Sequence, residues 1–178
     1  MEKGRTVLFR TLFLALIVTG LLVEVSLSAA RGRHGKIRVQ GALRSELNSV
    51  LRATNELHSA CISLNEEKID TSIRLLIEGL NRANKKSVLV KDQRPHLVRM
   101  LDKAKVHLEL ALNRSEETRK KNLKEAFINL VQVAKVYKLD KYRIFFCPSD
   151  KAVWLQKSWR PRNPVHPKNY GSCGELVR

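Results

Sequence analysis

The sequence predicts an all-α protein, an up-down-up-down four-helix bundle over residues 41–139 with a mostly irregular C-terminal tail, residues 140–178, packed on it. Two observations support the bundle. Apolar residues recur at three- and four-residue spacing through four segments, which is the pattern of amphipathic helices. The links between these segments are short, and short links place successive helices antiparallel. Helical cytokines need long crossover connections, so the sequence argues against that class.

Residues 1–30 have the order of a secretory signal peptide: basic residues, an apolar run, and then small residues up to Ala30. The alternative is an uncleaved membrane anchor. It is less favoured because Gly20 and Glu24 interrupt a run that is already short for a span of about 20 residues. We expect cleavage after Ala30, a basic lead segment over residues 31–40, and a periplasmic or secreted protein without a stable membrane span.

The first two predicted helices are joined by a tight link. One apolar stripe runs from about Gly41 to Leu64, and a second runs from Glu66 to about Asn84. Asn65 lies between them and belongs to the residue types that cap helix N-termini, and the acidic residues after it complement the positive helix start. We therefore expect the second helix to begin directly after Asn65.

The third and fourth predicted helices follow a basic link, residues 85–91. The third begins near Pro95, because proline suits the first helical turn, and its stripe continues to Leu112. Ser115 is a candidate N-cap for the fourth helix, whose apolar stripe ends at Tyr137.

The tail changes in composition to aromatic, proline and glycine residues. One short strand is predicted in it, from Arg143 to Phe146, and the remainder is expected to be loop. Trp154 and Trp159 are expected to pin the tail onto the bundle, since an indole buries a large area and has one donor to satisfy.

The chain is strongly basic, with 34 Lys and Arg against 17 Asp and Glu and a formal net charge of +17. Such a charge predicts attraction to anionic polymers or to an anionic envelope surface, without specific nucleic-acid binding. No acid pair, nucleophile elbow, phosphate loop or Cys-x-x-Cys pair occurs in the sequence. We therefore expect a protein that is not an enzyme.

Two thiols and an imidazole in the tail form the main candidate site. Cys147, Cys173 and His166 are candidate metal ligands, because thiolates and imidazole suit Cu(I) and Zn(II). In an oxidising compartment the two cysteines could instead form a disulfide that closes the tail loop. The sequence leaves both alternatives open.

Four further residues are possible additional ligands. His58 and Cys61 lie at i and i+3 on one helix face, and His96 and Met100 lie one turn apart on another helix. Each also has a simpler interpretation. Cys61 and Met100 suit the core, His58 suits a hydrogen-bonded boundary position, and His96 suits the surface.

The order of short elements in the tail carries a resemblance. The elements are Cys147-Pro148, Trp154-Leu155, Asn163-Pro164 and Cys173-Gly174. In this order they resemble the tail of a domain-of-unknown-function family of exported bacterial proteins, a domain also appended to periplasmic adaptor subunits of copper and silver efflux systems. Members of that family carry Cys-Pro-Met and Asn-Pro-Tyr, whereas this chain has Ser149 and Val165 at the third positions.

The resemblance implies a metal-handling role in the cell envelope. We expect an exported protein that binds a soft metal, copper first and zinc second, and that buffers it, senses it or hands it to efflux components. The absence of the family's methionine puts the identity of the metal in question, since a thioether favours Cu(I). The alternative is a non-catalytic structural or interaction module. In that alternative a Cys147–Cys173 disulfide stabilises a basic surface for an acidic envelope partner.

Overall fold

The computed structural model describes residues 37–139 and 141–177, apart from the side chain of Gln93. This part of the chain is mostly helical and has a small three-stranded sheet, which confirms the predicted helical class in its coarse form. No helix within it is long and apolar enough to cross a membrane. The predicted signal peptide and most of the lead segment lie outside the described residues. The four α-helices of the described residues are α2 (Gly41–Ser63), α3 (Glu66–Lys86), α4 (Arg94–Ala111) and α5 (Glu116–Val136).

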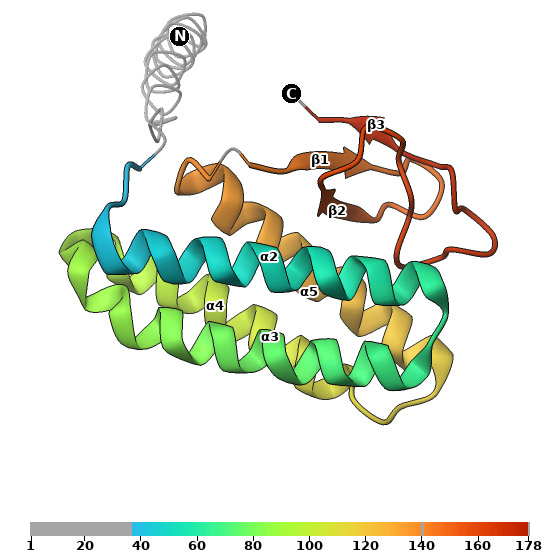
Figure 1. Cartoon of the computed structure of the whole chain (residues 1–178), viewed down its shortest axis with the longest axis horizontal. Helices are drawn as coiled ribbons and strands as arrows, with labels where there is room; N and C mark the ends of the chain where they lie inside the picture. The colour runs from blue at the N-terminus through green and yellow to red at the C-terminus, as the bar shows by residue number, and fades with distance from the viewer. Residues whose placement is uncertain (1–36, 140, 178) are drawn as a thin grey trace, which may run out of the picture. The chain divides into compact units, whose positions relative to one another are not determined.

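The helices pack side by side around one core. α2 lies against α3, α3 against α4 and α4 against α5, and Figure 1 shows successive helices running in opposite directions. The apolar stripes of the sequence supply the core, and burial of one such side chain stabilises by about 1.5–3 kcal/mol. Fully buried examples, one from each helix, are Leu47, Ile73, Leu101 and Phe127.

The two predicted helix caps have different outcomes. The Asn65 side chain accepts a hydrogen bond from the Lys68 backbone N–H at 2.9 Å, which confirms this cap. Ser115 occupies the N-cap position of α5, but its hydroxyl donates to Thr118 Oγ1 at 3.1 Å and makes no capping bond to the backbone. The capping role predicted for the Ser115 side chain is therefore wrong, although the helix begins where expected.

The link between α3 and α4 is more regular than predicted. α3 continues to Lys86, and the 3₁₀ helix η1 (Ser87–Gln93) fills the remainder up to the start of α4. Lysines at the end of α3 complement the negative C-terminal end of a helix. The charge that suggested a loop therefore suits the last helical turn.

The end of the predicted lead segment packs along the bundle. The Ile37 backbone N–H donates to the Val136 carbonyl at 2.7 Å, and Val39 is buried in the core. These contacts fix the backbone on either side of the exposed Arg38.

The tail contains a sheet of order β2-β1-β3, made of β1 (Arg143–Phe146), β2 (Val153–Gln156) and β3 (Glu175–Leu176). β1 is the predicted strand, and the expectation of loop for the rest of the tail is wrong. β2 and β3 both pair antiparallel with β1. β2 contacts α2 and α5, so the sheet lies on that side of the bundle (Figure 1).

The two tryptophans of the tail lie in opposite environments. Trp154 is fully buried and stacks on Phe145, with ring centroids 5.9 Å apart. Trp159 is 70% exposed, and the Arg143 guanidinium lies over its ring at 3.5 Å. The prediction that both indoles pin the tail is confirmed for Trp154 and wrong for Trp159.

The buried side chain of Gln156 satisfies the indole and shapes the loop after β2. Its Oε1 accepts from Trp154 Nε1 at 2.8 Å and from the Arg162 backbone N–H at 3.1 Å. Its Nε2 donates to the carbonyls of Ser158 at 3.0 Å and Arg160 at 2.6 Å. These four bonds use the whole hydrogen-bonding capacity of a primary amide.

Substitution of Gln156 by Leu keeps the approximate volume and removes all four bonds. We expect the free energy of unfolding to fall by about 3 kcal/mol, because buried polar groups left without partners cost about 1–3 kcal/mol each. Urea denaturation followed by circular dichroism measures the change. The matched control is Gln132→Leu, at an exposed position of α5, for which we expect a change within about 0.5 kcal/mol. Equal effects of the two substitutions would contradict the role given to Gln156.

Candidate functional site

Cys147 and Cys173 form a disulfide, with the sulfurs 2.06 Å apart. Cys147 is fully buried and Cys173 is partly exposed, and the bond closes a loop between residues 26 positions apart. Closing a loop of this length stabilises by about 3 kcal/mol in the chain-entropy model. Of the two alternatives left open by the sequence, the structure has the disulfide. Neither sulfur is a thiolate here, and thiolate is the form that binds metal.

The third residue of the candidate metal set, His166, does not complete a metal site with the disulfide. Its ring packs edge-on against Tyr170, with centroids 5.7 Å apart. Among the described residues, no group of three or more His, Cys, Asp or Glu side chains is arranged to hold a metal ion. Metal binding by Cys147, Cys173 and His166 stays a prediction, which now requires reduction of the disulfide.

His58 and Cys61 are both buried on α2, as their simpler interpretations required. His58 Nε2 bonds the Arg162 carbonyl at 2.8 Å, so this histidine ties the tail to α2. Burial is the main cause that lowers the pKa of His58, which favours the neutral ring. Burial raises the pKa of the Cys61 thiol from 9.0 to about 12. Cys61 therefore stays protonated and unreactive near neutral pH.

His96 and Met100 do not share an environment on α4. His96 is exposed near the start of the helix, and Met100 is buried in the core. Met100 therefore acts as a packing residue, and His96 belongs to no group of three or more His, Cys, Asp or Glu side chains that could hold a metal ion among the described residues.

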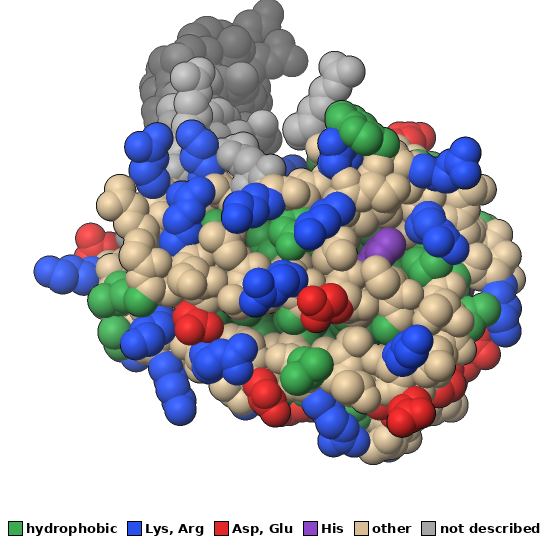
Figure 2. Space-filling model, viewed as in Figure 1, with side chains coloured by type: hydrophobic (Ala, Val, Ile, Leu, Met, Phe, Trp, Pro, Cys, Tyr) green, Lys and Arg blue, Asp and Glu red, His purple; other side chains and the backbone are tan. Residues whose placement is uncertain are grey.

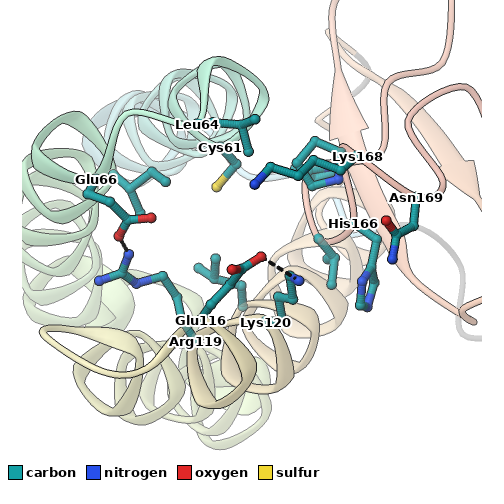
Figure 3. Close-up of a pocket in the computed structure, with 14 residues that line it drawn as sticks. Cys61, Leu64, Glu66, Glu116, Arg119, Lys120, His166, Lys168 and Asn169 are labelled. Carbon is teal, nitrogen blue, oxygen red and sulfur yellow. Dashed lines mark ion pairs between the residues drawn. The ribbon is translucent and has the colours of Figure 1, made fainter.

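A pocket of about 260 Å³ lies where the end of α2, the starts of α3 and α5, and residues 164–169 of the tail meet. Figure 3 shows the Cys61 sulfur and the Lys168 side chain directed into it, with His166 and Asn169 on the tail side. Its two helix-borne cations are paired. Arg119 bonds Glu66 and Asp70, and Lys120 bonds Glu116 at 2.6 Å.

The ion pairs of Arg119 give one wall of this pocket a structural role, since they join helix ends. The Arg119 guanidinium is nearly buried and joins α5 to the first turns of α3 through Glu66 and Asp70. Its Nε–H also donates to the Ala111 carbonyl at 3.3 Å, at the end of α4. A cation with this set of partners holds three helix ends together and has little capacity left for a ligand.

Two hollows beside the first half of α2 are lined by several basic residues, and both include Lys141. The first is formed by Arg38, Gln40, Arg44, Lys138 and Lys141, and the second by Ser45, Asn48, Ser49, Arg52, Lys141, Tyr142 and Lys157. Among the described residues that line them, none is acidic, and no ion pair is formed by these basic side chains within the described part of the chain. We call the six exposed cations the basic strip: Arg38, Arg44, Arg52, Lys138, Lys141 and Lys157.

The basic strip is the feature that sequence reasoning missed. Its members come from the lead segment, α2, the link from α5 to β1, and the end of β2. The high net charge predicted a basic surface, but charge composition does not show which cations meet. Figure 2 shows Lys and Arg side chains outnumbering acidic ones over the α2 side of the face in view, with more of the acidic ones over α3.

No protein-family model matches this chain, and no curated protein or solved structure matches it either. The resemblance of the tail to the family of exported proteins therefore stays a prediction. What the chain binds has to be inferred from its own geometry.

Thiol titration tests the disulfide and the burial of Cys61 together. We expect the unreduced protein to show no rapidly reacting thiol when folded, one thiol when denatured, and three when denatured and reduced, because the chain has three cysteines. The measurement is reaction with a chromogenic disulfide reagent. Three reactive thiols in the denatured, unreduced protein would show that the tail cysteines are not joined.

The raised pKa of Cys61 also predicts a loss of stability in alkaline solution. The folded state favours the protonated thiol, so this stabilisation is complete below pH 9.0 and is lost as the pH rises towards about 12. We expect Cys61 to account for a decrease of about 1 kcal/mol between about pH 8 and pH 10. Urea denaturation at both pH values measures it. In Cys61→Ala, which has no titrating thiol, the decrease should be smaller by this amount; an unchanged pH dependence would contradict the assignment.

Proposed function

We propose that this protein is a non-catalytic binding protein of the cell envelope that holds an anionic partner on its basic surface. The observation that carries the proposal is the basic strip, in which six exposed cations from four separate segments surround two neighbouring hollows. No acidic residue belongs to the described lining of either hollow, and cations gathered in this way create a positive potential that attracts and orients anions. In the pocket where the helices meet the tail, by contrast, the two helix-borne cations, Arg119 and Lys120, are already engaged by carboxylates.

The disulfide supports an extracytoplasmic location. Structural disulfides persist in oxidising compartments such as the periplasm and the extracellular space. This one joins Cys147, directly after β1, to Cys173, which precedes the glycine that packs against the buried Trp154. A role in bracing the tail also accounts for both cysteines without a metal.

Copper binding, with zinc as the second choice, is the competing hypothesis. It would use Cys147 and Cys173 as thiolates with His166 as an auxiliary ligand, and the protein would pass the metal to efflux components. The disulfide makes this hypothesis conditional on a reductant. Binding of an anionic partner has no such condition, and we favour it for that reason.

The proposal predicts binding that weakens steeply with salt. We expect the oxidised protein to bind a soluble polyanion such as dextran sulfate, and the affinity to fall more than about tenfold between about 50 and 200 mM salt, because several ion contacts are screened and counterions are released. Isothermal titration calorimetry measures the affinity. Uncharged dextran of the same length is the control ligand. Absence of binding to any polyanion at about 0.15 M salt, the physiological ionic strength, would contradict the proposal.

A further inference from the structure

We propose that the basic strip is a binding track for a linear anionic glycan, an inference that rests on the proposed function and names its ligand class. Two arginines of the strip come from α2, on which Arg44, Asn48 and Arg52 follow one another at four-residue spacing. At 1.5 Å per residue, the two arginines are separated by about 12 Å along the axis. This is longer than one carboxylate or sulfate, so a ligand that meets both arginines carries several charges along its length.

Two lysines of the strip that lie outside α2 belong to segments held in place by hydrogen bonds of their backbone. Lys157 donates its backbone N–H to Asn55 Oδ1 on α2 at 3.1 Å, and its carbonyl accepts a hydrogen bond from the Arg143 guanidinium. Lys138 precedes the buried Leu139, whose backbone N–H donates to the Ala134 carbonyl at 3.1 Å. Lys157 and Lys138 therefore project from a fixed backbone, which reduces the ordering that a ligand would have to impose.

The uncharged residues between the cations suit sugar hydroxyls. Ser45, Ser49, Asn48, Gln40 and Tyr142 line the same two hollows and supply both donors and acceptors. A polymer with hydroxyl groups between its charges can use these groups and the cations together. The alternation of cations with hydroxyl and amide groups is what favours a glycan.

Other polyanions fit the strip less well. An acidic protein partner usually buries an apolar or aromatic centre, and in the described lining of the two hollows Tyr142 is the single aromatic residue and no aliphatic side chain is present. Single-stranded nucleic acid binds through successive aromatic stacking platforms. Near the strip the exposed Trp159 is a single ring, and Arg143 covers one of its faces.

The exposed indole of Trp159 lies where it can contact a sugar ring of the bound glycan. It follows Lys157 by two residues, and Arg143 contacts both the Trp159 ring and the Lys157 carbonyl. The indole is therefore held at the Lys157 end of the strip with 70% of its surface exposed. An exposed aromatic face beside cations provides an apolar surface for the carbon-bound hydrogens of a sugar ring.

The experiment compares two variants that lose the same charge. The strip variant is Arg44→Gln, Arg52→Gln and Lys141→Gln, and the control variant is Lys85→Gln, Lys103→Gln and Lys121→Gln, all at exposed positions. Binding of a heparin oligosaccharide, a linear sulfated glycan, is measured by calorimetry with the disulfide intact. We expect a loss of affinity of about thirtyfold in the strip variant and less than about threefold in the control, because only the first removes direct contacts.

Two single substitutions test the ends of the strip. Trp159→Ala should weaken heparin binding by about threefold to tenfold, since an exposed aromatic contact of this kind contributes about 1 kcal/mol. Glu56 lies four residues after Arg52 on α2, so its carboxylate is on the helix surface next to a cation of the second hollow. Glu56→Gln should therefore strengthen binding by a few-fold, a gain that a damaged fold would not produce.

The outcomes separate this proposal from the proposed function. Equal losses in the strip and control variants would overturn the strip as the site while leaving a basic binding surface in place. Tighter binding of poly-glutamate, or of a single-stranded oligonucleotide with the same number of charges, would overturn the glycan assignment. If the wild-type protein binds none of these polyanions at about 0.15 M salt, the proposed function fails as well.

Discussion

The buried indole of Trp154 imposes the constraint on which the arrangement of the tail depends. A buried N–H group without a partner is costly, and Gln156 supplies the acceptor two residues later on the same strand. The Gln156 amide can form further hydrogen bonds, and it uses them to hold the backbone of the following loop from Ser158 to Arg162. The Arg162 carbonyl in turn bonds His58 on α2. One buried aromatic residue thereby fixes the path of the tail across the helices.

The path of the tail also determines which of its side chains lie at the surface beside α2. Lys157 follows Gln156 directly and bonds Asn55 of α2 through its backbone, so it lies beside the cations of that helix. On the other side of the indole, a Cβ on Gly174 would lie 2.6 Å from Pro161 and 2.9 Å from the Trp154 ring, too close for any side chain. The disulfide at the preceding residue holds this glycine against the ring. The same packing that buries Trp154 therefore places Lys157 beside the arginines of α2 in the basic strip.

The sequence allowed the helices to be predicted well because their apolar stripes are local patterns with a period near 3.6. β1 was predictable from its own composition. β2 and β3 were not, since β3 has two residues and both strands exist through pairing with β1. Trp154 and Trp159 differ in burial because one lies within β2 and the other in the exposed loop after it, a distinction that composition does not make.

The candidate site was less predictable because it depends on contacts between distant segments. The sequence placed Cys147, His166 and Cys173 near one another along the chain, and that proximity suits a disulfide and a metal site equally well. The basic strip is harder still, because Arg38 and Lys157 come from opposite ends of the described chain. Charge composition indicates that cations are abundant, and only the fold shows which of them line the same hollows.

The ordered elements of the tail can be explained by packing alone. Trp154 and Cys147 are fully buried, Gly174 fits against the indole, and the buried Asn163 donates to Asp150 at 2.8 Å and accepts from the backbone N–H groups of Val165 and His166. Ser149 follows Pro148, and its Oγ lies 3.8 Å from the Cys173 sulfur of the disulfide. A chain that keeps Cys-Pro, Trp, Asn-Pro and Cys-Gly in this order therefore keeps the parts of one folded tail. In this chain the series therefore has a structural explanation that needs no metal, and the ligand is better sought among the exposed residues that the tail brings together.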